Sequence, residues 1–256
     1  MSAWLLLFRK EMLESARNFK WIWIPLVFLA LGITNPITTY FMPEILQAGG
    51  VAAEAAKLIP TPTSEEIIVK SLSQYGTLGM LVFALSFMGI VAGERQSGSA
   101  IMVLVKPVSY GHYITSKWAA MTCITLAAVT LGQLGTGYYM NVLFDDNVYS
   151  EALVSGLVYA LWLILLNSIT LLLSCLMKAP AGIAFVSVAF AALLSLVTQL
   201  LGDAMRWSPS RLTAEAGRLV EDSGAGDDLW LLVLITAALI AILLTLATAA
   251  SRRMLR

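Results

Sequence analysis

The segment from Gly93 to Lys117, GERQSGSAIMVLVKPVSYGHYITSK, combines side chains that can recognise another protein. An acid and a base, Glu94 and Arg95, precede a turn at Gly98, and an apolar run follows that includes Ile101 and Leu104. The segment then closes with Lys106-Pro107, Tyr110 and Lys117. A short apolar run between charges must be buried against lipid, its own bundle or a partner. The expected chemistry is therefore docking rather than bond-making.

The sequence contains no motif that would make the chain an enzyme. No Gly-Lys dipeptide occurs, which excludes a phosphate-binding P-loop, and neither GxSxG nor HExxH is present. His112 is the only histidine, so a multi-histidine metal site within the chain is excluded. Cys123 and Cys175 both lie in apolar runs, where packing is the expected role. We expect no catalytic residue, metal or cofactor in this chain.

The elements that position the 93–117 segment are expected to be membrane helices. The chain is 59% hydrophobic and 12% charged, too few charges for a water-exposed surface. Apolar stretches of about 20 residues can cross a bilayer. Six stretches free of charged residues reach that length: 21–41, 72–92, 119–139, 152–176, 181–201 and 229–250. The predicted fold is an all-α integral membrane protein with six transmembrane helices, in a single domain over 1–256. A net charge of zero argues against nucleic acid as a partner.

The basic residues predict the orientation of these spans. With six crossings both termini lie on one side, and that side holds eleven of the sixteen lysines and arginines. Cytoplasmic loops carry the excess of Lys and Arg. Both termini and the 93–117 segment are therefore predicted to be cytoplasmic, in a bacterial-type cytoplasmic membrane.

Three segments outside the spans are expected to contain short helices. Residues 1–20 predict an amphipathic helix lying in the inner membrane interface, or alternatively an ordinary cytoplasmic extension. The external loop 43–70 is expected to be mostly irregular, with a short helix near 51–58. Residues 203–228 predict a serine-capped amphipathic helix. The apolar face of the first helix is Trp4, Phe8, Met12, Ala16 and Phe19, and that of the last is Leu212, Ala216, Leu219 and Val220.

Uncharged polar residues lie within the predicted spans. They form a candidate substrate path: Thr34, Asn35, Gln133, Asn167 and Gln199. The alternative is that each makes hydrogen bonds between helices of the bundle. Gly89 and Gly93 form a GxxxG pair at the inner end of the second span, which close helix packing would explain.

Taken together, these features resemble ABC-2 type ABC transporter permeases. The resemblance rests on Glu94-Arg95 with Gly98, the apolar run, Lys106-Pro107-Val108-Ser109 and Lys117 after the second span. It extends to RKEMLESARNFK before the first span and to the Ser-Pro-led helix before the last. It covers the whole chain at the level of layout, while each motif alone is degenerate.

The resemblance implies a permease whose cytoplasmic loop acts as a coupling helix in a groove of a separate ABC ATP-binding subunit. The N-terminal helix would be the elbow helix, and the external helices would cap the outer opening. The partner subunit would bind ATP and Mg. The assembly would contain a second permease chain, identical or homologous, and would export its substrate. The uncharged spans favour an amphipathic or lipid-like substrate.

Two alternatives come from other classes. A membrane sensor or assembly factor would use the same segment to dock a cytoplasmic protein without transport. A secondary carrier would move its substrate without ATP, but ion-coupled carriers usually place ionisable groups at mid-membrane. The predicted spans have none, although a site lined by serines or carbonyls would escape this argument.

Overall fold

The computed structural model describes residues 2–50, 62–105, 108–220, 226 and 228–253. Within these residues the secondary structure is helical throughout, and six helical segments are long and apolar enough to cross a membrane. This confirms the predicted all-α membrane fold. The segments are Lys20–Tyr40, Ser64–Gln96, Tyr110–Phe144, Tyr149–Leu176, Pro180–Leu201 and Leu229–Arg252.

The first two helices form an elbow. Helix α1 (Ala3–Arg17) ends at a turn in which Phe19 adopts a left-handed conformation with φ of 56°, and α2 (Lys20–Tyr40) begins directly after it. Helix α1 packs against α9 (Tyr110–Phe144). Trp4 stacks on Phe8, and its indole Nε1 donates to Thr115 Oγ1 at 3.0 Å. The predicted apolar face is therefore covered by protein toward its N-terminal end, whereas Phe19 is exposed.

The second span is interrupted rather than continuous. It consists of α5 (Ser64–Gln74), a π-helical turn η1 (Tyr75–Gly79), α6 (Met80–Phe87) and, after a turn, α7 (Ala92–Gln96). Thr63 Oγ1 accepts from the Glu66 amide and starts α5 eight residues before the predicted span. Helix α3 (Met42–Ala48) also lies in the segment expected to be irregular. That expectation is wrong for both stretches, and the helix expected near 51–58 lies outside the described residues.

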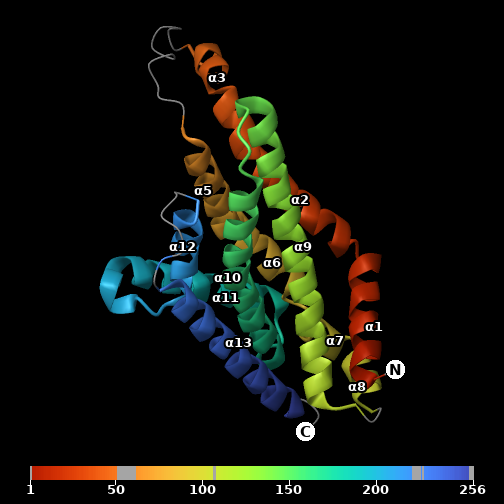
Figure 1. The fold of residues 1–256 in the computed structure, drawn as a ribbon. Helices are drawn as coiled ribbons and strands as arrows, with labels where there is room; N and C mark the ends of the chain where they lie inside the picture. The colour runs from red at the N-terminus through yellow and green to blue at the C-terminus, as the bar shows by residue number, and fades with distance from the viewer. Residues whose placement is uncertain (1, 51–61, 106–107, 221–225, 227, 254–256) are drawn as a thin grey trace.

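The centre of the bundle is formed by α9 and α10 (Tyr149–Leu176). Helix α9 packs along α2, and α10 packs against α9, α6, α11 (Pro180–Leu201) and α13 (Leu229–Arg252). Helix α10 contributes two of the largest fully buried side chains, Tyr159 and Trp162. Helices α1, α7 and α8 (Ser99–Leu104) lie at the same end of the bundle as the end of α13 (Figure 1).

The closest helix contact is between α2 and α9, where glycines face each other. A Cβ atom added at Gly132 would lie 2.2 Å from Tyr75 Oη and 2.7 Å from the Phe28 carbonyl oxygen. One added at Gly32 would lie 2.3 Å from the Gly132 carbonyl oxygen. At Gly89 and Gly93 an added Cβ would meet nothing within 4 Å. Within the chain, close packing therefore occurs at Gly32 and Gly132. The prediction of close packing at the GxxxG pair, Gly89 and Gly93, is wrong within the chain.

Gly132→Ala is expected to lower the free energy of unfolding by about 2 kcal/mol, because overpacking a tight contact typically costs 1–3 kcal/mol. The neighbouring atoms include α2 backbone, which cannot move aside as a side chain would. Chemical unfolding of the purified chain in detergent would measure the change. Gly89→Ala is the control, since its new methyl group meets open space. Equal stability of the two variants would contradict the proposed tight contact.

The segment before the last span folds back onto the bundle. A short 3₁₀ turn η2 (Gly202–Met205) is followed by η3 (Pro209–Arg211) and α12 (Leu212–Arg218). The predicted apolar face is confirmed, since Leu212, Ala216 and Val220 are buried in the core. The predicted serine cap is wrong: α12 continues from the 3₁₀ turn without a capping side chain. The hydroxyl of Ser208 instead accepts from Thr198 Oγ1 at 2.7 Å, which ties the segment to α11.

Candidate functional site

Helix α8 presents an apolar surface at the end of the bundle that holds α1. Gly98, with φ of 74°, separates it from α7 in a conformation that glycine adopts readily. Ile101, Met102 and Val105 are 54%, 76% and 79% exposed. These three residues are called the α8 face below. An exposed cluster of this kind at a tight turn is typical of a docking surface.

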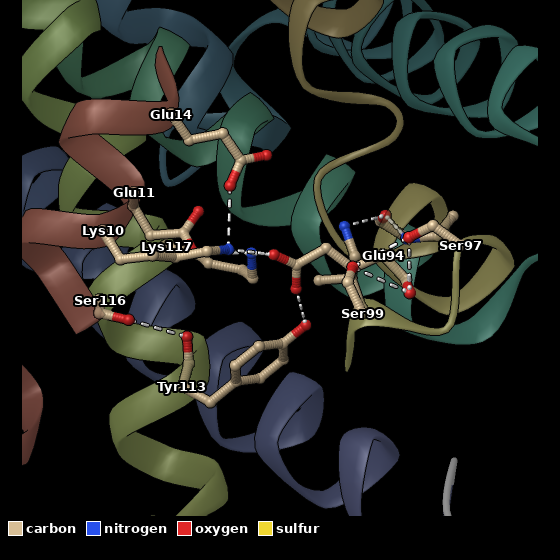
Figure 2. A network of polar contacts seen from close by, with 12 residues as sticks. Lys10, Glu11, Glu14, Glu94, Ser97, Ser99, Tyr113, Ser116 and Lys117 are labelled. Atoms are coloured by element: carbon tan, nitrogen blue, oxygen red, sulfur yellow. Dashed lines mark hydrogen bonds and ion pairs between the residues drawn. The ribbon is translucent and has the colours of Figure 1, made fainter. Parts of the chain in front are cut away.

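A buried group of charged residues lies directly behind α8. Lys117 of α9 is 1% exposed, and its Nζ lies 2.9 Å from Glu11 Oε1 of α1 and 2.9 Å from Glu94 Oε1 of α7. Three elements that are far apart in the sequence therefore meet at one ammonium group (Figure 2). We call Lys10, Glu11, Glu14, Glu94, Tyr113 and Lys117 the charge cluster.

The remaining members of the charge cluster complete its hydrogen bonding. Lys10 Nζ lies 2.9 Å from both Glu11 Oε1 and Glu14 Oε2, and it also pairs with Glu94. Tyr113 donates its hydroxyl to Glu94 Oε2 at 2.5 Å (Figure 2). Burial lowers the pKa of Lys10, but the surrounding carboxylates outweigh it, so that this pKa lies above its usual value. Lys10 therefore remains charged at physiological pH.

Charge pairing explains why Glu11, Glu94 and Lys117 of the cluster can be buried. Taking an ion from water costs several kcal/mol unless partners with good geometry surround it. Both carboxylate oxygens of Glu94 have partners, and Lys117 lies between two carboxylates. Removing one member would leave its partners buried and unpaired, which is the costly outcome. The cluster therefore holds α1, α7 and α9 in one arrangement.

A second set of contacts joins α7 to the end of α10. Ser174 Oγ accepts from the amides of Val91 and Ala92 at 3.1 and 2.9 Å, and donates to the Met88 carbonyl oxygen at 3.1 Å. Arg95 donates to the Cys175 carbonyl oxygen at 3.1 Å. These bonds satisfy the backbone groups that the break after α6 would otherwise leave unpaired. A force on α8 would thus reach α1, α9 and α10 through α7.

The charge cluster is not arranged as a cation site. Glu11, Glu14 and Glu94 offer carboxylate oxygens within 4.8 Å of one another, the one such group among the described residues. The amino groups of Lys10 and Lys117 pair with these carboxylates. A metal ion would have to displace a lysine ammonium, so the existing ion pairs account for the acidic group.

The structure divides the predicted coupling residues into two groups. Ile101 lies on the α8 face, whereas Glu94 and Lys117 are buried and Arg95 points to the end of α10. Glu94 and Lys117 are therefore not exposed to a partner in this conformation, and a role of either in coupling would be indirect. Tyr110 and Lys117 lie within α9 and not in a loop. Leu104 belongs to α8, but the structure does not describe its side chain. Lys106 and Pro107 lie outside the described residues.

The sequence reasoning missed three residues that complete this region. Glu11 was not recognised, although it follows Trp4 by seven residues and Phe8 by three, which places it on the apolar face of α1. An acid on such a face signals a buried partner. Tyr113 precedes Lys117 by four residues and therefore shares its helix face. For Ser174 no local signal exists, because its partners lie more than 80 residues away.

The polar residues expected to line a substrate path are separated in the structure. Asn35 bonds to Ser71 and Gln74, and Asn167 donates to Thr125 Oγ1 at 2.7 Å. Gln133 is buried beside Gly156, and Thr34 donates to its own helix. Of the five, Gln199 lines a pocket of about 680 Å³ between the second span, α10, α11 and α12. Interhelical bonding thus accounts for Asn35 and Asn167, while Gln199 lines a pocket.

The fold and the six apolar helices define the class of protein, a multi-pass helical membrane protein. The chain belongs to the family described as "Protein of unknown function (DUF2705)", whose model matches residues 53–211. Over 221 residues it is 33% identical to the "Uncharacterized transmembrane protein YxlG" of Bacillus subtilis (strain 168), and the match covers 86% of each chain. The region matched by the family includes Glu94, Lys117 and all of α8.

Proposed function

We propose that this chain is the membrane-spanning permease subunit of an ATP-driven exporter of the ABC-2 type. The observation that carries the proposal is the α8 face, an exposed apolar surface on a short helix fixed to the bundle through α7. Its site is the one that the sequence resemblance assigns to a coupling helix. The partner would be a separate ABC ATP-binding subunit that binds ATP and Mg.

The charge cluster supports this function because a coupling helix must transmit force. ATP-driven closure of a partner would press on α8, and a flexible loop would absorb that motion. Here Glu94 connects α7 to α1 and α9, and Arg95 and Ser174 connect the same segment to α10. The helices that meet at α7 can therefore move together. This rigidity would be of little use to a protein that only tethers a partner.

The proposal includes both termini in the cytoplasm and a second permease chain, identical or homologous. The positive-inside distribution supports the orientation, since α1, α8 and the end of α13 lie at one end of the bundle (Figure 1). Outward-facing Phe185, Phe190 and Leu193 on α11 are available to lipid or to that second chain. An amphipathic or lipid-like substrate suits spans without internal charges.

Copurification from the native membrane in mild detergent, followed by mass spectrometry, tests the proposal. We expect a P-loop ATPase in equal amount with this chain. Ile101→Asp should abolish that recovery while leaving the amount of inserted chain unchanged, because Ile101 is exposed. Copurification with a kinase or an envelope enzyme instead would indicate the sensor or assembly factor. Ion-driven transport by this chain alone in liposomes would indicate a secondary carrier.

A further inference from the structure

A pocket of about 680 Å³ opens between the second span, α10, α11 and α12. Its volume is in the range of sites that hold small molecules. Gly76 and Thr77, at the π-helical turn, line one side, and Ser195 and Gln199 of α11 line the other. Helix α11 packs against α6. The pocket lies beyond this contact and extends to Gly202 and α12. It therefore lies in the half of the bundle remote from α8.

Two hydrogen-bond donors in this pocket have no protein partner. Tyr159 Oη and Trp162 Nε1 are buried and without a bond among the described residues, and both residues line the pocket. Each side chain is 1% exposed. Buried polar groups are normally satisfied, and an exception calls for an explanation. A molecule in the pocket, reached by a small movement of these side chains, would supply the acceptor that both donors lack.

The position of these donors indicates the kind of molecule. Tyr159 is ten residues into α10, about 15 Å along a helix. Helix α10 has 28 residues, about 42 Å, which exceeds the roughly 30 Å of hydrocarbon in a bilayer. The donors thus lie below one membrane surface, within the apolar layer. A ligand that reaches them must be largely apolar and must present acceptors such as carbonyl oxygens.

The sides of the pocket indicate where the ligand enters. Leu78 and Leu81 beside one wall, and Leu193 and Leu196 beside the other, are exposed on the outer surface of the bundle, where lipid would surround them. The outer rim is polar, with an ion pair between Arg218 Nη1 and Glu215 Oε1 at 2.7 Å. Exposed leucines beside a cavity whose lining is partly apolar and partly polar suit the acyl chains, esters and headgroup of a glycerophospholipid.

We propose that this pocket binds a glycerophospholipid of the outer leaflet, whose ester carbonyl oxygens accept from Tyr159 and Trp162. Its acyl chains would lie along Leu72, Met80 and Ala192, and its headgroup would lie at the rim. That this lipid comes from the outer leaflet and is the exported cargo rests on the orientation and transport role in the proposed function. Its binding does not, because the pocket is complete within one chain.

Photolabelling tests the proposal without any ATPase. The purified chain is placed in phosphatidylcholine nanodiscs with phosphatidylglycerol that carries a diazirine on one acyl chain, and labelled residues are located by mass spectrometry. We expect saturable labelling at Met80 or Ala192. Tyr159→Phe should raise the half-saturating lipid concentration about fivefold, the equivalent of one hydrogen bond. It should leave thermal stability undiminished, since Tyr159 Oη has no protein partner to lose.

A matched pair of variants controls for general lipid contact. Ser195→Trp fills the pocket and should abolish the saturable label, whereas Leu196→Trp, on the neighbouring outward-facing residue, should not. Equal labelling of both variants, or non-saturable labelling, would overturn the site. Displacement of the label by a hydrophobic peptide, but not by unlabelled phospholipid, would overturn the lipid assignment. Neither result would alter the ATPase copurification, so the two proposals fail separately.

Discussion

Lys117→Met should lower the free energy of unfolding by about 3 kcal/mol, because removing one partner of a buried ion pair typically costs 3–5 kcal/mol. The substitution keeps an unbranched side chain, one atom shorter, and removes the ammonium group that lies 2.9 Å from both Glu11 and Glu94. Lys10 still pairs with both carboxylates, which places the expected cost at the lower end of the range. The carboxylates should then draw water, and α1 should separate from α9.

Chemical unfolding in detergent measures the loss of stability, and limited proteolysis at Arg9 or Arg17 reports the release of α1. The control is Lys178→Met, since Lys178 is exposed and lies beside α7, where its carbonyl oxygen accepts from Gln96 Nε2. Adding Glu11→Gln to Lys117→Met should recover part of the loss, because it removes one of the three carboxylates that then share the single ammonium of Lys10. A stable Lys117→Met chain with α1 still protected would show that the charge cluster does not hold the elbow.

Met102→Asp should reduce ATP hydrolysis coupled to this chain at least tenfold in a reconstituted complex with the copurified ATPase. Met102 is 76% exposed on the α8 face, so a carboxylate there would be desolvated on docking without a partner. Because the side chain makes little contact within the chain, unfolding should change by less than about 0.5 kcal/mol. Loss of coupling with an intact fold is the signature of a docking surface.

Met102→Leu is the matched variant, since it keeps an apolar side chain of similar volume and should retain coupling. Charge reversal at Glu94 is a poorer test, although the sequence suggests it. A lysine at that position would face Lys10 and Lys117 and would disturb the fold together with any coupling. Full ATPase coupling in Met102→Asp would contradict the assignment of α8 as the contact surface.

The fold was predictable from the sequence because the bilayer imposes strict requirements on each segment. A span must be long, apolar and helical, since every backbone group has to be bonded internally. Interruptions within a span are harder to predict from the sequence. The π-helical turn at Tyr75–Gly79 leaves the hydropathy of the second span unchanged, and the extension of α9 to Tyr110 adds polar residues that resemble a loop. Both features depend on which side chains the neighbouring helices bury.

That this is a helical membrane protein, with a short apolar run after the second span and a break at Gly98, follows from the sequence alone. Composition, span length and the conformational freedom of glycine are local properties, and they act wherever the segment lies. Only the tertiary structure decided that Glu94 and Lys117 are buried while Met102 is exposed, and that Tyr159 and Trp162 line a pocket. The reason is that burial and charge pairing depend on residues from distant segments. Glu11 and Lys117 lie 106 positions apart and meet only when α1 packs against α9.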